Sequence, residues 1–185
     1  ARMDDARVHA RQQQLYMLSL FNCVTRLMQQ YDLTTREIFD TEKQYLDIPA
    51  AIGKPEEFET WILDVSLRIH ESINRERDNK VILEARRYIE NHYQDPSLSV
   101  EMICRELHMS PAYFSTMFRK VTGQTYIAYL TEVRLQKAVE LLNETDDKTY
   151  VIAQKVGYQE QNYFSYVFKK RFGISPTKYR GTQNG

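Results

Sequence analysis

The chain has 185 residues, of which 42% are hydrophobic, and its 25 Lys and Arg are balanced by 25 Asp and Glu. Its 6 glycines and 5 prolines exclude a collagen-like or low-complexity chain. No apolar run approaches the roughly 20 residues that cross a bilayer, and the N-terminus lacks the apolar core of a signal peptide. Because the chain does not begin with Met, we expect an excised fragment or the remnant of a tag. We expect a folded, cytoplasmic protein of one or two small domains with reduced cysteines.

Charge is distributed unevenly between the two halves. Residues 1–80 hold 11 basic and 14 acidic residues, whereas residues 81–185 hold the remaining 14 basic and 11 acidic residues. The resulting net charges of −3 and +3 do not by themselves identify a partner. They favour treating residues 1–80 and 81–185 as separate domains.

Residues 1–80 are predicted to be helical, with apolar residues at helical spacing in two long segments. A short helix is expected at 35–39, followed by a loop with Pro49, Gly53 and Pro55. The charged run 75–80 is interpreted as a solvated linker. The apolar residues of the two long segments each form a stripe along one helix face, which favours bundle packing or a dimer seam over a cofactor site. They are Met17, Leu20, Phe21, Val24, Leu27 and Met28, and then Phe58, Ile62, Val65, Ile69 and Ile73.

The second half is also predicted to be helical. A helix over 81–93 should end before Asp95 and Pro96, because the residue before a proline is disfavoured in a helix. Shorter helices follow from Ser99 onward. Alternating β-branched runs and hairpin turns are absent from the sequence, so the expected fold class is all-α.

An internal repeat is the most informative feature of the sequence. Residues 113–123 are YFSTMFRKVTG and residues 163–173 are YFSYVFKKRFG, so one aromatic and basic pattern recurs at an offset of 50. A short helix precedes each copy at an offset of 49, which leaves one extra residue in the second turn. Each copy, at about 99–123 and 149–173, is predicted to be a helix-turn-helix unit.

Residues with special backbone preferences fit such units. Gly157 in the second turn, and His108 at the same place in the first, tolerate a positive φ angle. Ser110 is a predicted N-cap, and Pro111 suits the first helical position after it. Both copies end in a glycine, which commonly terminates a helix.

The paired phenylalanines of each copy predict which residues face outward. With the phenylalanines inside, the opposite faces carry small polar residues and amides flanked by the cations Arg119 and Lys169, a chemistry suited to base edges and phosphates. For two such copies in tandem, this interpretation is favoured over solvated positions on a bundle. The predicted base-facing residues are Ala112, Ser115, Thr116, Gln161, Asn162, Ser165 and Tyr166.

A long helix over about 125–143 is predicted between the copies. At about 1.5 Å per residue it would span about 28 Å, close to the roughly 34 Å between successive major grooves on one face of DNA. One chain could then place two recognition helices in adjacent major grooves of double-stranded DNA. The apolar positions of this helix are Ile127, Leu130, Val133, Ala138, Leu141 and Leu142.

Residues from about 81 to 180 resemble the DNA-binding domain of the AraC/XylS family of bacterial transcription regulators. The resemblance implies seven helices, two recognition helices in major grooves, and control of transcription, most often activation through contacts with RNA polymerase. His108 stands where the family usually has Gly, and Tyr166 where an arginine is common. The matching motifs are Leu98-Ser99, Ser110 to Ser115, Phe118 to Lys120, Ile152-Ala153, Val156 to Tyr158, Asn162 to Ser165, Phe168 to Gly173 and Ser175 to Arg180.

Within this resemblance, basic residues are expected to contact phosphates and to make binding depend on salt. Residues 1–80 are similar to the helical region before the DNA-binding domain of YesN-type two-component response regulators. That similarity implies phosphorylation of a domain that precedes them. Residues 1–80 would relay this state either by forming a homodimer or by releasing an inhibitory contact. The predicted phosphate contacts are Arg119, Lys120, Arg134, Lys169, Lys170 and Arg171.

Catalytic and metal chemistry has little support in the sequence. The four histidines are far apart, and Cys23 and Cys104 have no adjacent histidine. We therefore expect neither an enzyme nor a cofactor. Two hypotheses remain: a sequence-specific DNA-binding regulator, which we favour, and a helical protein-interaction module that does not bind DNA.

Overall fold

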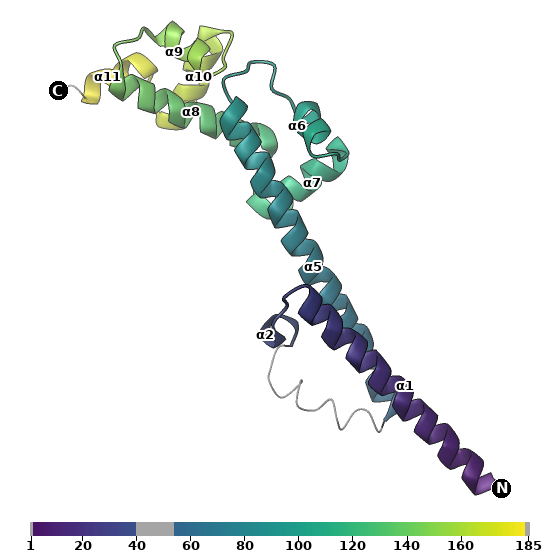
Figure 1. The fold of residues 1–185 in the computed structure, drawn as a ribbon. Coiled ribbons are helices and arrows are strands. Elements are labelled where there is room, and N and C mark those ends of the chain that lie inside the picture. The colour runs from purple at the N-terminus through teal and green to yellow at the C-terminus, as the bar shows by residue number, and fades with distance from the viewer. Residues whose placement is uncertain (1, 40–53, 184–185) are drawn as a thin grey trace. The chain divides into compact units, whose positions relative to one another are not determined.

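The computed structural model describes residues 2–39 and 54–183, and the side chains of residues 8–39 and 54–182. These residues are all-α, as predicted, and the chain divides after Arg77 into two compact units. The described helices are α1 (Arg2–Gln30), α2 (Thr35–Ile38), α5 (Pro55–His92), α6 (Val100–Glu106), α7 (Pro111–Thr122), α8 (Tyr126–Glu144), α9 (Thr149–Lys155), α10 (Gln161–Phe172) and α11 (Pro176–Gln183) (Figure 1).

In the first unit, α1, α2 and the beginning of α5 share one small core. Its aromatic centre is Trp61, whose ring lies 5.6 Å from that of Phe58 and 6.4 Å from that of Phe39. The predicted stripe of α1 is only partly buried, because Leu27 is exposed. The predicted loop with Pro49 and Gly53 lies outside the described residues. The buried core residues are Val24, Met28, Ile38, Phe39, Val65 and Ile69.

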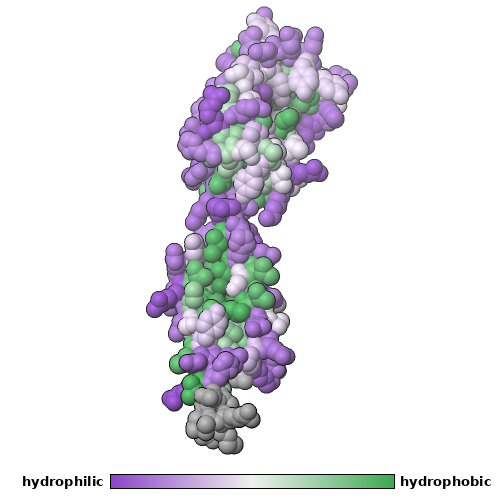
Figure 2. Space-filling view, turned by 90° about the vertical axis from the view of Figure 1, so that its right-hand side faces the viewer, coloured by the Kyte–Doolittle hydropathy of each residue, from purple (hydrophilic) through white to green (hydrophobic). Residues whose placement is uncertain are grey.

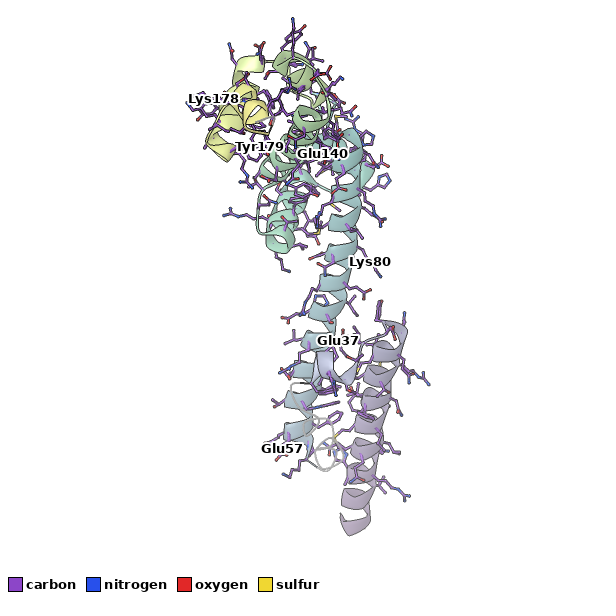
Figure 3. The ribbon with its side chains drawn as sticks, turned by 90° about the vertical axis from the view of Figure 1, so that its left-hand side faces the viewer. Glu37, Glu57, Lys80, Glu140, Lys178 and Tyr179 are labelled. Carbon is purple, nitrogen blue, oxygen red and sulfur yellow. The ribbon has the colours of Figure 1, made fainter. Side chains whose placement is uncertain are left out.

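Helix α5 is continuous from Pro55 to His92, so the prediction of two helices separated by a solvated linker at 75–80 was wrong. Figure 3 shows Lys80 on the uninterrupted ribbon. The segment contains neither glycine nor proline after Pro55, and nothing in its backbone therefore ends the helix. One member of the charged run, Asp78, is buried.

The second unit contains two hydrophobic cores, one for each helix-turn-helix. The end of α5 packs with α6 and α7 around Phe114 and Phe118, and α9 and α10 pack around Phe164 and Phe168. Helix α8 contributes to both cores. Its residues Tyr126, Tyr129 and Leu130 belong to the first core, whereas Leu135, Ala138 and Leu142 belong to the second. The predicted core position Ile127 is exposed.

The turns confirm the local predictions. His108 and Gly157 have φ angles of 53° and 87°. The Ser110 hydroxyl accepts a hydrogen bond from the Tyr113 amide, and Pro111 begins α7. Four residues separate α6 from α7 and five separate α9 from α10, as the change of repeat offset implies. The glycines that end α7 and α10 are both left-handed.

None of the helices in the described part of the chain is long and apolar enough to cross a membrane. The described residues also contain no group of three or more potential metal ligands among His, Cys, Asp and Glu. Both cysteines are free thiols; Cys23 is exposed and Cys104 is buried.

Gly157 and Gly123 form a matched pair for testing the close packing of the second turn. Both have positive φ, so either alanine substitution should cost about 1 kcal/mol of backbone strain. A Cβ on Gly123 would meet no atom within 4 Å, whereas one on Gly157 would overlap the Tyr93 carbonyl oxygen and lie 2.9 Å from the Arg134 guanidinium. We therefore expect Gly157→Ala to lose about 3 kcal/mol of unfolding free energy in urea titrations. Equal losses for Gly157→Ala and Gly123→Ala would contradict this packing.

Candidate nucleic-acid interface

The residues that α7 buries determine which of its residues face the solvent. Phe114 and Phe118 are fully buried, with ring centroids 5.4 Å apart, and both pack against α8 tyrosines. Four of the predicted contacts therefore lie on the solvent side. They are Ala112, Ser115, Thr116 and Arg119, and all are exposed.

The hydroxyl groups of Ser115 and Thr116 on this face already donate to acceptors within the helix. Ser115 Oγ donates to the Pro111 carbonyl at 2.8 Å, and Thr116 Oγ1 donates to the Ala112 carbonyl at 3.1 Å. A hydroxyl that donates in this way keeps its oxygen lone pairs as acceptors. In this arrangement both side chains suit donors on a base edge, such as the exocyclic amines of cytosine and adenine.

Helix α10 has the same construction with larger polar side chains. Phe164 and Phe168 are fully buried, and Phe168 also lies against Tyr179 of α11, which Figure 3 labels. Gln161 and Asn162 are exposed in the first turn. Side-chain amides at such a position can pair with adenine through a donor and an acceptor together.

Three tyrosines and one serine refine the predicted face. Ser165 is only partly exposed, whereas Tyr166 is 63% exposed. Sequence reasoning did not select Tyr113 and Tyr163, which occupy the same place in the two repeats and are 47% and 60% exposed. A tyrosine directly before the first phenylalanine of each repeat was the signal that could have identified them. Sequence reasoning treated these tyrosines as part of the aromatic core pattern.

Basic residues gather in the last turns of α7 and α10. Lys120 is well exposed, and its Nζ lies 3.8 Å from the Asp78 carboxylate. Arg171 makes two hydrogen bonds, of 2.9 and 3.0 Å, to the Glu132 carboxylate of α8. These hydrogen bonds hold the pKa of Glu132 below its usual value. Since ion pairs between solvent-accessible side chains contribute only about 0–1 kcal/mol, a phosphate can compete with Glu132 for Arg171.

Arg134 occupies a different environment from the other predicted phosphate contacts. Its Nε and Nη2 donate to the carbonyl oxygens of Tyr93 and Asp95, both at 2.8 Å, and its guanidinium lies over the Tyr158 ring at 5.4 Å. Burial lowers the pKa of Arg134 from its usual value. These contacts do not favour the predicted phosphate contact, because the guanidinium of half-buried Arg134 is already bound within the unit.

Comparisons with known proteins agree with this geometry. The profile of a helix-turn-helix domain family, HTH_18, matches residues 103–182. The arabinose operon regulatory protein of Escherichia coli K12 is 33% identical over 112 residues, which are 60% of this chain and 38% of that protein. The chain thus spans little more than a third of the length of the curated relatives it matches.

Two solved structures extend the comparison. The C-terminal domain of the two-component response regulator YesN from Fusobacterium nucleatum is 38% identical, has a TM-score of 0.51, and matches 52% of this chain and 93% of that chain. The DNA-binding domain of AdpA, a global transcriptional factor solved with a target DNA, is 25% identical with a TM-score of 0.52, over 55% of this chain and 90% of that chain.

The ion pair between Glu132 and Arg171 predicts a change in nucleic-acid affinity. Replacing Glu132 with Gln removes the carboxylate that a phosphate must displace from Arg171, so duplex DNA of any sequence should bind about threefold tighter, with the slope of log affinity against log salt nearly unchanged. Fluorescence anisotropy against random-sequence duplexes measures both. Glu140→Gln is the matched control, because Glu140 lies on the same helix and pairs with Lys137 instead. Identical shifts for the two variants would mean that Glu132 does not compete with phosphate for Arg171.

Proposed function

The chain belongs to the AraC/XylS family of transcription regulators, and from this we propose that it is a sequence-specific regulator whose recognition helices, α7 and α10, enter two adjacent major grooves of one duplex. One observation carries the proposal. Each repeat buries its phenylalanine pair completely and turns small polar or amide side chains to solvent. The relatives named above are regulators, and we infer binding, and not catalysis, for this chain.

Sequence preference would come from the first turns of the two helices. We assign Gln161 and Asn162 to adenine edges, and Ser115 and Thr116 to base donors or to the thymine methyl group. Tyr166 offers an apolar ring and a hydroxyl at the same face. Ala112 and Ser165 are small enough for the helix backbone to approach the bases closely.

Affinity would come mainly from phosphate contacts. The five cations that remain after Arg134 is set aside are Arg119, Lys120, Lys169, Lys170 and Arg171. Five released counterions give a slope of about −4.5 in log affinity against log salt. Raising salt from about 50 to 200 mM should therefore weaken binding about 500-fold.

The first unit is the candidate for a link between copies of the chain. Apolar residues gather on its surface (Figure 2). On α1, Tyr16, Leu20, Cys23 and Leu27 are spaced four, three and four residues apart, which places them on one helix face outside the core. The flanking positions carry uncharged residues, among them Gln12, Ser19 and Gln30. A neutral apolar face of this kind can pack against an identical face without charge repulsion.

We extend the proposal to the whole protein in three respects. The chain is the C-terminal part of a two-component response regulator, it forms a homodimer through residues 1–80, and it activates transcription by contacting RNA polymerase. The likeness to the YesN C-terminal domain supports the first. The α1 face supports the second, and the family resemblance supports the third.

Binding to selected DNA tests the central proposal. Duplexes selected from a random library by the chain should bind far more tightly than random duplexes and weaken steeply with salt. Asn162→Ala should reduce the preference for one base pair by about tenfold, whereas Lys170→Met should weaken all duplexes alike and lower the salt slope by about one. Gel-shift titrations at two salt concentrations measure both effects. If no sequence is enriched and micromolar protein shifts no duplex, the chain is instead a protein-interaction module.

The α1 face predicts dimerisation. Leu27→Glu places a charge on each side of the two-fold seam and should raise the dimer dissociation constant at least about tenfold, as sedimentation equilibrium would show. Leu83→Glu is the matched control, because Leu83 is also exposed but lies on α5 in the second unit. Mild oxidation should link two wild-type chains through Cys23. A wild-type chain that remains monomeric at high concentration would exclude the seam.

A further inference from the structure

Arg134 lies between the two hydrophobic cores of the second unit. On α8, Leu130 packs in the core of the first helix-turn-helix and Leu135 in the core of the second. Arg134 is therefore at the point along the helix where one core gives way to the other. Its half-buried side chain contacts main-chain carbonyl groups on one side and the Tyr158 ring on the other.

On the side of the first core, Arg134 binds the chain just beyond α5. Helix α5 ends at His92, and the two accepting carbonyl groups belong to Tyr93 and Asp95. Carbonyl oxygens after a helix carry the negative end of the helix dipole, so a guanidinium there is favourable. The Asp95 carboxylate accepts hydrogen bonds from the Ser97 amide and hydroxyl, and its negative charge also favours the nearby guanidinium.

On the side of the second core, the same guanidinium contacts the turn between α9 and α10. It lies over the ring of buried Tyr158. Gly157 approaches so closely that a side chain there would meet both Arg134 and the Tyr93 carbonyl. At Gly157 the turn before α10 therefore packs closely on the chain segment after α5, and the Arg134 guanidinium lies beside this contact.

The geometry requires an arginine. A planar guanidinium offers two donors in a fixed fork while its face stacks on a ring, whereas a lysine offers one point charge. Arg134 thus makes contacts in three directions, to two carbonyl groups and one aromatic ring. Rotation of one helix-turn-helix against the other would break at least one of these contacts.

We propose that Arg134 is a positioning residue that fixes the direction of α10 relative to α7, and thereby sets the spacing between the two DNA blocks that one chain can bind. This rests on the proposed function, since spacing has a meaning only if both helices bind one duplex. Arg134 acts through the protein and makes no contact with the DNA.

A spacing series tests the proposal with the whole chain. The probe is the two-block duplex selected from random sequence by the wild-type chain, with one to five base pairs inserted between the blocks. Wild-type affinity should fall at least about tenfold when the spacing is wrong. Arg134→Met should bind the best spacing about tenfold more weakly and show less than about a threefold difference among spacings.

Arg119→Met is the matched control, because it removes an exposed cation from α7. It should weaken every spacing alike and lower the salt slope by about one, leaving the shape of the spacing profile unchanged. If Arg134→Met gives this same pattern, Arg134 is a phosphate contact and the proposal is overturned. Failure of the wild-type chain to bind any duplex would overturn the proposed function instead.

A measurement without DNA distinguishes failure of the positioning role of Arg134 from failure of the proposed DNA binding. Spin labels on Ser115→Cys and Gln161→Cys, in a Cys23→Ser background, report the distance between α7 and α10, and excess unlabelled protein suppresses distances between chains. Arg134→Met should at least double the width of the distance distribution, and Arg119→Met should not change it. An unchanged distribution would overturn the positioning role. If Arg134→Met loses its helical circular dichroism, Arg134→Lys replaces it, with the same expected broadening and the same overturning result.

Discussion

The burial of two phenylalanine pairs is the interaction on which the second unit depends. Phe114 with Phe118, and Phe164 with Phe168, lie fully inside their cores, and each buried ring contributes about 1.5–3 kcal/mol of transfer free energy. Residues four apart share one helix face. Burying them therefore fixes the rotation of each recognition helix about its axis, and that rotation decides which side chains can meet a base.

Much of this could be predicted from the sequence because it is local. The N-cap at Ser110, the positive φ of His108 and Gly157, and the inward phenylalanines follow from residue type and spacing. The role of Arg134 does not, because its partners are main-chain carbonyls about forty positions earlier in the chain, and no side-chain pattern marks a carbonyl. The continuity of α5 was missed for another reason: a run of charges resembles a linker, yet those residue types also form helices.

The ion pairs explain how a chain of zero net charge can suit a nucleic acid. Lys120 is paired with Asp78 of α5, and Arg171 with Glu132 of α8. A phosphate must exchange with a carboxylate at both places, so part of the electrostatic gain is lost. In the proposed complex this exchange would reduce the affinity for random DNA, whereas the proposed base contacts of the first helical turns would be unaffected. The arrangement favours discrimination between sequences over non-specific affinity.

A second helix-turn-helix can strengthen binding to the duplex only if the direction of its recognition helix is fixed relative to the first. Two recognition helices on one chain act as linked binding modules, and the second binds at a high effective concentration when the geometry fits both grooves. That advantage is lost if the helices turn freely, since most orientations cannot engage both grooves at once. In the described second unit, α8 joins the two cores, Gly157 permits close contact between the halves, and Arg134 bonds across that contact. A dimer through α1 would join two such rigid pairs, and an input that changed dimerisation would then act on affinity without altering either recognition helix.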